Sequence, residues 1–156
     1  MKSEIDGVVI TELKRWDDPR GWLIELFRQD ELEKGLFPVM LYVSLTKPGM
    51  IRGPHEHSRQ TDYFCFIGPS TFRLYVWDNR SDSISFRKKC QIDVGEGNQV
   101  AVIIPPGVVH GYKNIGEADG IVYNAANRLY RGENRKEPAD EIRHEDISDS
   151  PFVIDK

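Results

Sequence analysis

The sequence predicts an all-β domain, and a two-sheet jelly roll is the architecture that best accounts for it. Short apolar runs recur at spacings of about ten residues, and Gly, Pro, Asn and Asp interrupt them. Very little of the chain has helical periodicity. A chain of 156 residues also suits one domain with a proper core, so we expect a single domain over residues 1–156.

The expected strands follow one another along the chain, with turn residues between them. They cover residues 8–13, 22–27, 39–46, 62–67, 71–78, 84–92, 99–104, 110–114 and 120–126. Gly68-Pro69-Ser70 forms the turn between the two central strands. Apolar residues occupy both faces over 72–77, which indicates a strand covered on both sides or one at a subunit contact.

One short helix is expected, beginning near Asp30, with Glu31 and Glu33 in its first turn and Gly35 as its stop. From residue 130 the composition changes, because residues 131–138 are highly charged and nearly free of apolar side chains. This pattern predicts that residues 130–156 form a charged surface loop followed by a C-terminal arm.

Composition excludes several classes of function. The formal net charge of −4 argues against a protein that binds nucleic acid or an anionic membrane. No apolar run approaches the roughly 20 residues of a membrane helix, and the first residues lack a signal-peptide core. Cys65 and Cys90 are the only cysteines, so neither a disulfide framework nor a cysteine zinc site is indicated. We expect a cytoplasmic protein.

Two histidines separated by one residue are the first candidate site. Side chains at positions i and i+2 of a strand share a face, so His55 and His57 should project side by side, with Arg52 nearby. A second candidate follows the turn Pro105-Pro106-Gly107, whose fixed and permissive backbone angles define a bend that aims His110. Both segments carry groups that bind anions, metals or protons.

Taken together, the two segments resemble the two motifs of the cupins, which are small double-stranded β-helix barrels of the jelly-roll type. The matching residues are Gly49, His55, His57, Asp62 and Gly68 in the first motif, and Pro105, Gly107, His110 and Asn114 in the second. Asp62 stands where metal-binding cupins usually have glutamate. The second motif lacks the usual glycine upstream of its proline.

A narrower resemblance, to the dTDP-4-dehydrorhamnose 3,5-epimerase family, covers most of the chain. Residues 18–25 resemble its segment Asp-x-Arg-Gly-x-x-x-Glu, and residues 50–55 its signature Val-Leu-Arg-Gly-Leu-His. Gln60 is similar to a glutamine further on. Residues 104–112 resemble Ile-Pro-x-Gly-x-x-His-Gly-Phe, and residues 122–124 lie where the family has its catalytic tyrosine. The implied function is epimerisation of a 4-keto-6-deoxy sugar nucleotide, without a cofactor.

Epimerisation beside a keto group needs a base, an acid on the opposite face and a donor for the enolate oxygen. The unperturbed pKa of histidine is about 6.5, so His55 can serve as the base at neutral pH. The resemblance implies that Tyr123, expected on an inward face, returns the proton. Arg52 would offer fixed positive charge to an enolate or a phosphate.

The remaining site residues are expected to bind substrate. They are His57, Gln60 and His110 within the barrel, together with Arg20 and Glu25, which the resemblance assigns to an N-terminal segment (residues 1–28) that reaches into a partner subunit of a homodimer. The family places an acidic partner for its histidine near the C-terminus, in a segment that this chain does not visibly match. Asp62 is therefore expected to orient His55, because the strand parity of Glu56 points it away.

Three alternatives remain open. His55, His57, Asp62 and His110 form a set of three histidines and one carboxylate that suits a divalent metal ion, which would make the protein a metal-dependent cupin enzyme. A sugar-nucleotide 3,4-ketoisomerase would move protons on a similar substrate. A non-catalytic sugar-binding cupin would have lost the acidic partner.

Overall fold

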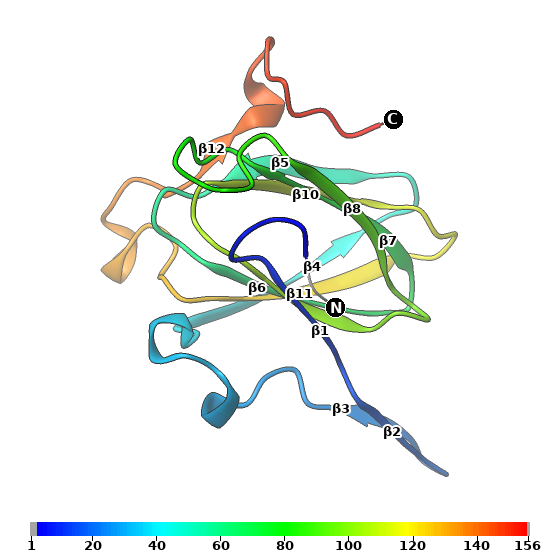
Figure 1. Cartoon of the computed structure of the whole chain (residues 1–156). Helices are drawn as coiled ribbons and strands as arrows, with labels where there is room; N and C mark the ends of the chain where they lie inside the picture. Colours follow the sequence, from blue (N-terminus) through cyan, green and yellow to red (C-terminus); the bar gives the residue numbers. More distant parts are fainter. Residues whose placement is uncertain (1–2, 156) are drawn as a thin grey trace.

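Two five-stranded antiparallel sheets face each other in the computed structural model, which describes residues 3–155 (Figure 1). The first sheet has the order β1 (Val9–Glu12), β9 (Val100–Ile104), β6 (Asp62–Gly68), β11 (Gly120–Ala126) and β4 (Met40–Thr46). The second has the order β12 (Ile142–Arg143), β5 (Ile51–Glu56), β10 (Val108–Asn114), β7 (Thr71–Asp78) and β8 (Lys89–Gly95). This arrangement confirms the predicted all-β, cupin-type barrel.

The core lies between the sheets because alternate residues of each strand point inward. Phe64 and Phe66 of β6 meet Phe72 and Leu74 of β7 there, and all four are almost completely buried. The intervening residues of β6 face the outside of the first sheet, where Cys65 packs in a separate cluster. Strand parity therefore decides which side chains reach the barrel interior.

The strands predicted at 71–78 and 120–126 have those bounds in the structure. The strand expected at 84–92 begins later, as β8, because residues 79–88 form a loop tied to Asp78 by side-chain hydrogen bonds from Arg80, Ser83 and Ser85. The strand expected at 22–27 is shorter, as β3 (Gly21–Ile24), and it pairs with an unpredicted strand, β2 (Arg15–Asp18).

The expected short helix is instead two single 3₁₀ turns, η1 (Gln29–Glu31) and η2 (Lys34–Leu36). Leu32 and Glu33 between them are extended, and Leu32 packs against the outer face of the first sheet. Two more 3₁₀ turns, η3 (Glu133–Arg135) and η4 (His144–Asp146), follow the barrel. No helix within residues 3–155 is both long and apolar enough to cross a membrane.

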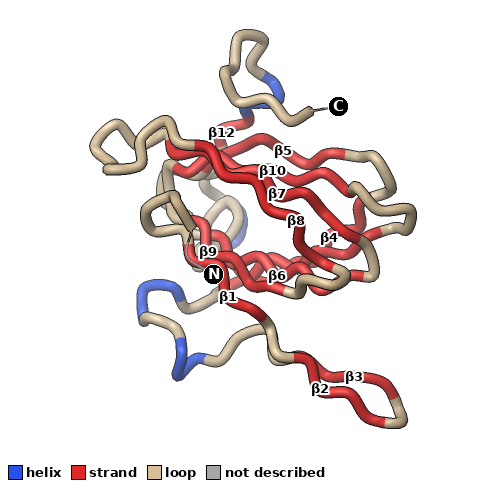
Figure 2. Tube along the Cα trace, turned by 45° about the vertical axis from the view of Figure 1, so that its right-hand side comes forward, coloured by secondary structure: helices blue, strands red, loops and turns tan. Residues whose placement is uncertain are grey.

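Two segments extend beyond the barrel. The β2–β3 hairpin projects away from it, below the first sheet (Figures 1 and 2). The C-terminal arm lies at the opposite side, where β12 adds to the edge of the second sheet through β5. Phe152 and Ile154 of the arm pack with Tyr75 and Trp77 on the outer face of β7. This contact explains why residues 72–77 are apolar on both faces.

Candidate active site

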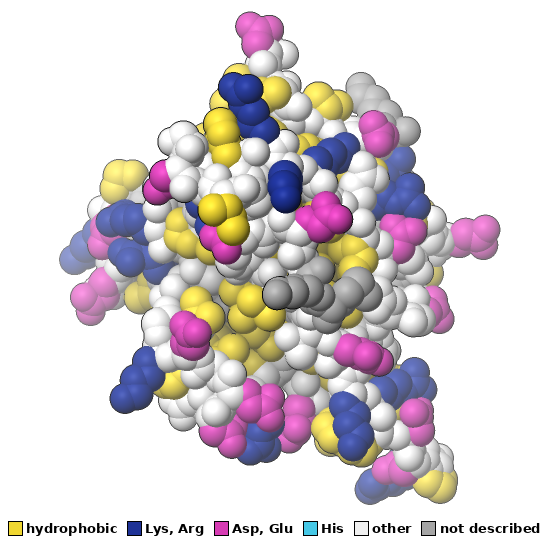
Figure 3. Space-filling view, in the orientation of Figure 1, with side chains coloured by type: hydrophobic (Ala, Val, Ile, Leu, Met, Phe, Trp, Pro, Cys, Tyr) yellow, Lys and Arg dark blue, Asp and Glu magenta, His cyan; other side chains and the backbone are white. Residues whose placement is uncertain are grey.

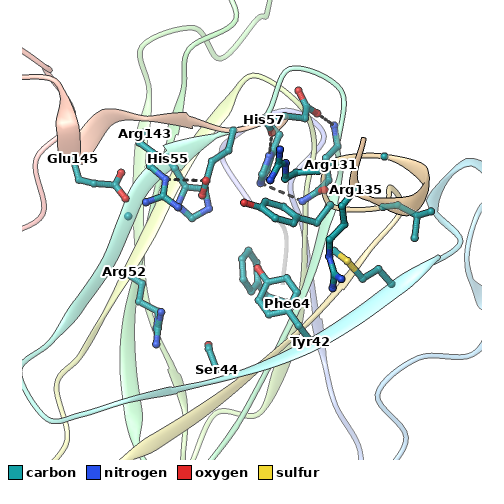
Figure 4. Close-up of a pocket in the computed structure, with 18 of the residues that line it drawn as sticks. Tyr42, Ser44, Arg52, His55, His57, Phe64, Arg131, Arg135, Arg143 and Glu145 are labelled. Carbon is teal, nitrogen blue, oxygen red and sulfur yellow. Dashed lines mark hydrogen bonds and ion pairs between the residues drawn. The ribbon is translucent and has the colours of Figure 1, made fainter. Parts of the chain in front are cut away.

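A pocket of about 1120 Å³ opens at one end of the barrel, between the two sheets and two loops (Figure 4). Strands β4 and β5 form its walls, Phe64 and Tyr112 contribute aromatic rings, and the segments 129–135 and 140–145 close its rim. The lining combines apolar and aromatic surface with several charged side chains, as in sites that hold polar ligands of moderate size.

Three histidines converge beside this pocket, as the sequence predicts. His55 of β5 and His110 of β10 are register partners in the second sheet, and their ring centroids lie 4.5 Å apart. His57, just beyond the end of β5, lies 5.5 Å from His55 on the same measure. His55 and His57 line the pocket. His110 was expected to bind substrate, but it is 1% exposed, lies behind the other two histidines and does not line the pocket.

Asp62 is the buried centre of the cluster. Its Oδ2 lies 3.2 Å from Nε2 of both His57 and His110, and the side chain is fully buried. Its Oδ1 accepts hydrogen bonds of 2.8 Å from Gln60 Nε2 and Asn124 Nδ2. Burial opposes its ionisation, but the two imidazoles hold its pKa well below the ordinary value. Asp62 is therefore an anion in the folded protein.

His57 carries the opposite charge. Burial would lower its pKa, but the close contact with the Asp62 carboxylate and its charge, helped by Asp140, raise it to about 9. Its Nδ1 donates to the backbone carbonyl of Asp140. The Asp140 carboxylate in turn accepts backbone hydrogen bonds from residues 58–60, at 2.8–3.1 Å. Asp140 thus fixes the turn that carries His57, and Gln60 completes the network.

His55 has a different environment. Burial, followed by the charges of His110 and His57, lowers its pKa to about 2, so it is a neutral imidazole. The hydrogen bonds and ion pairs of Asp62 in the described chain go to other residues and none goes to His55. The expectation that Asp62 orients His55 is therefore wrong. The Asp62 carboxylate instead pairs with His57 and His110.

Tyr123 is the second correction. It packs on the outer face of the first sheet with Cys65 and Ala125, because Val122 and Asn124, its neighbours on β11, point inward. It does not line the pocket. Three other tyrosines do: Tyr42 of β4, Tyr112 of β10, whose hydroxyl pairs with Ser44 Oγ at 3.0 Å, and Tyr130 of the rim loop. The Tyr42 hydroxyl accepts a 2.9 Å hydrogen bond from Asn124. Burial and the charge of Asp62 raise the pKa of Tyr42, which keeps it protonated.

Four arginines line the pocket, Arg52, Arg131, Arg135 and Arg143, beside three carboxylates, Asp140, Glu141 and Glu145. Arg52 was expected, and its guanidinium donates to Thr46 Oγ1 at 2.9 Å and to the Leu45 carbonyl at 2.8 Å. The other three come from the charged segment after residue 130, which the sequence predicted to be a surface loop and arm. No local signal separates a basic pocket rim from a solvated loop, since both have the same composition.

Arg20 and Glu25, the two site residues expected from the N-terminal segment, do not reach this pocket. The side chain of Arg20 is 90% exposed at the tip of the β2–β3 hairpin, where it pairs with Asp18 at 2.6 Å. Glu25 lies 3.6 Å from Arg28 in the segment that follows. Neither residue contributes to the site of its own chain.

The cluster could also hold a metal ion. One ligand atom from each of His55, His57, Asp62 and His110 lies within 4.8 Å of the others. Asp62 Oδ2 and His110 Nε2 make no well-oriented hydrogen bond within the described chain. His57 and His110 each direct Nδ1 toward a backbone carbonyl, as metal-bound histidines commonly do. The donor set therefore suits a divalent transition metal.

The fold and the site define a cupin-type barrel with an arginine-lined pocket beside a histidine cluster. The chain belongs to the dTDP-4-dehydrorhamnose 3,5-epimerase family, because residues 2–147 match the model of that family. It is 36% identical over 135 residues to Agl13 of Haloferax volcanii, described as a probable low-salt glycan biosynthesis epimerase, with 85% of each chain covered. It is 36% identical over 116 residues to the spore coat polysaccharide biosynthesis protein SpsL of Bacillus subtilis, covering 72% of this chain and 74% of that one.

Solved structures share the fold. A dTDP sugar isomerase from Desulfovibrio desulfuricans G20 superposes with a TM-score of 0.82 at 22% identity, covering 96% of this chain and 91% of the other. An epimerase from Legionella pneumophila, in complex with dTDP-4-keto-L-rhamnose, superposes with a TM-score of 0.76 at 23% identity, covering 92% and 75%. These likenesses confirm the barrel architecture.

Proposed function

We propose that this protein epimerises a 4-keto-6-deoxy sugar nucleotide by removing and returning a proton beside the keto group, without a cofactor. The observation that carries the proposal is the position of His55 on the wall of a pocket that is also lined by four arginines and three tyrosines. A neutral imidazole can accept a proton, and the arginines suit a substrate that carries a diphosphate. The relatives named above include Agl13, described as a probable epimerase of glycan biosynthesis.

In the proposed reaction, His55 takes the proton from the carbon next to the keto group. A tyrosine hydroxyl then protonates that carbon from the opposite face. Tyr42 and Tyr130 replace Tyr123 in this role, since both line the pocket, and Figure 4 shows Tyr42 on the side away from His55. The buried Asp62 holds His57 in place, and the exposed edge of the His57 ring contacts the sugar.

The test is proton exchange in D₂O, using 4-keto-6-deoxy sugars linked to dTDP, UDP and GDP. Deuterium at C3, C5 or both supports epimerisation, and the labelled position defines which carbon is inverted. Exchange with migration of the carbonyl would indicate a 3,4-ketoisomerase. Tight binding without exchange would indicate a sugar-binding cupin. The His55→Ala variant is the control, and it should show no exchange.

A metal-dependent cupin enzyme is the second candidate, favoured by the convergence of three histidines and Asp62. Arg143 opposes it, because this guanidinium lies close enough to lower the pKa of His55 and would also repel a cation. Elemental analysis of the purified protein, with and without chelator, separates the two candidates. Stoichiometric metal whose removal abolishes exchange would overturn the metal-free reaction.

We further propose a cytoplasmic homodimer in which the hairpin of each subunit reaches the pocket of the other. Strand β4 is an edge of the first sheet, and its outward side chains Leu41, Val43 and Leu45 are 61%, 59% and 49% exposed. An exposed apolar edge of this kind usually marks a contact. Figure 3 shows further hydrophobic surface between the barrel and the loops below it. Arg20 and Glu25 would then bind substrate in the partner subunit.

Analytical ultracentrifugation tests the dimer. The Val43→Lys variant should sediment as a monomer, because it puts a charge into the apolar edge. Ile84 is 90% exposed and lies in the β7–β8 loop, so Ile84→Lys is the matched control and should leave the dimer intact. A monomeric wild-type protein would contradict the proposal.

A further inference from the structure

Arg143 occupies a special place among the four pocket arginines. It lies directly opposite His55 in the ladder between β12 and β5. Paired residues of an antiparallel ladder share a face, with their Cβ atoms about 5 Å apart. Figure 4 shows Arg143 and His55 together on one wall of the pocket, with Arg52 further along that wall. The C-terminal arm thus delivers a cation to the side of the proposed base.

The guanidinium of Arg143 is held by one hydrogen bond and keeps other N–H donors unpaired. Its Nε donates to Glu141 Oε2 at 2.9 Å, which fixes the orientation of the planar group. A guanidinium has five N–H donors, and within residues 3–155 the two terminal amino groups of Arg143 have no hydrogen-bond partner. The side chain is 55% exposed, toward the pocket that it lines. These donors are free to bind a ligand oxygen.

The other charged groups are less suited to this position. Arg52 donates hydrogen bonds from Nε and one amino group to Thr46 and Leu45. It also lies three residues from His55, which is about 10 Å along an extended strand. His57 is paired with Asp62 inside the cluster. Arg131 and Arg135 come from the rim loop on the other side of the pocket (Figure 4), so Arg143 is the arginine that combines proximity to His55 with unpaired donors.

We propose that Arg143 binds the keto oxygen of the substrate and stabilises the enolate that forms when His55 removes the neighbouring proton. This inference rests on the proposed epimerisation. The C–H electron pair becomes the new C=C bond, the carbonyl π pair moves onto oxygen, and the proton goes to the free ring nitrogen of His55. Arg143 donates N–H groups to the oxygen, and the electron movements reverse when the carbon is reprotonated. Base and donor must be neighbours, because the oxygen is attached to the carbon next to the one that loses its proton.

The experiment compares kcat and KM for deuterium exchange in the full-length Arg143→Met and Arg143→Lys variants, with dTDP-4-keto-6-deoxyglucose as the first probe. Loss of one oxyanion donor should lower kcat about 10²–10³-fold and leave KM nearly unchanged. The Lys variant should recover part of the rate. Arg73→Met is the matched control, since Arg73 also pairs with a carboxylate, Asp93, at 2.7 Å but does not line the pocket.

A second measurement separates chemistry from a structural effect on the arm. Guanidinium ion added to Arg143→Ala should restore exchange, whereas an arm that has lost its place would not respond. A raised KM with unchanged kcat, or no effect of Arg143→Met, would overturn the inference and leave the proposed function intact. A wild-type protein that exchanges no proton with any sugar nucleotide of the panel would overturn both.

Discussion

Replacing Asp62 by asparagine tests the charge pair at the centre of the site. The pKa of His57 is about 9 in the folded protein, against an ordinary value of 6.5, and the pair is almost completely buried. This difference corresponds to about 3 kcal/mol of stabilisation when His57 is charged. Because the folded-state pKa is raised, the contribution is complete below about pH 6.5 and is lost as the pH rises through about 9.

The wild-type protein should therefore lose about 3 kcal/mol of unfolding free energy from this group between about pH 6 and pH 9.5. Asp62→Asn should be less stable by a similar amount at the lower pH, and the gap should close at the higher pH. Urea unfolding followed by tryptophan fluorescence measures this, with chelator present so that no metal binds the cluster. Asp93→Asn is the control, because its partner Arg73 is exposed and its charge is constant over this range.

Parallel pH profiles for the wild-type and Asp62→Asn proteins would refute the reasoning. A direct NMR titration of the His57 ring gives the same answer independently of unfolding. A measured pKa near the ordinary 6.5 would mean that Asp62 and His57 do not form a charged pair.

Three further predictions concern the reaction and the arm. His55→Ala should fold normally and lose exchange by about 10²–10⁴-fold, and an active variant would show that another group is the base. Tyr42→Phe or Tyr130→Phe should leave the first proton exchange intact and block formation of the inverted product. Tyr123→Phe should match the wild type in NMR analysis of the products. A defect confined to Tyr123→Phe would restore that residue to the site. Glu56→Ala removes the buried partner of His144, at 3.0 Å, so limited proteolysis should release the C-terminal arm more readily and KM should rise; an unchanged cleavage rate would show that this pair does not hold the arm.

The barrel and the histidine cluster could be predicted because they depend on local patterns. Alternation with a period of two places His55 and His57 together, and the Pro-Pro-Gly turn positions the strand that carries His110. The partner of Asp62 could not be predicted in the same way. It depends on how closely β6 of one sheet approaches two imidazoles delivered from the other, and this distance is a property of the assembled barrel.

The side of the sheet on which Tyr123 lies could not be predicted from the sequence of its own strand either. Ile121, Val122 and Tyr123 are consecutive apolar residues, so alternation does not say which of them points inward. The decisive contact is the hydrogen bond between Asn124 and Asp62, which joins residues 62 positions apart in the chain. The pocket charges of the arm were missed for a related reason. A segment that binds a charged ligand resembles a solvated one until its position beside the barrel is known.

The way the arm is attached has a consequence for its motion. β12 joins the sheet through two residues, and the further anchors include Asp140, the buried pair of His144 with Glu56, and the apolar end of the arm. Elements with few contacts open locally at a smaller cost in free energy than the whole domain. The amide protons of residues 142–147 should therefore exchange with solvent sooner than those of the central strands. Each such opening would carry Arg143 away from the pocket and leave the barrel folded, which gives a bound molecule a route out.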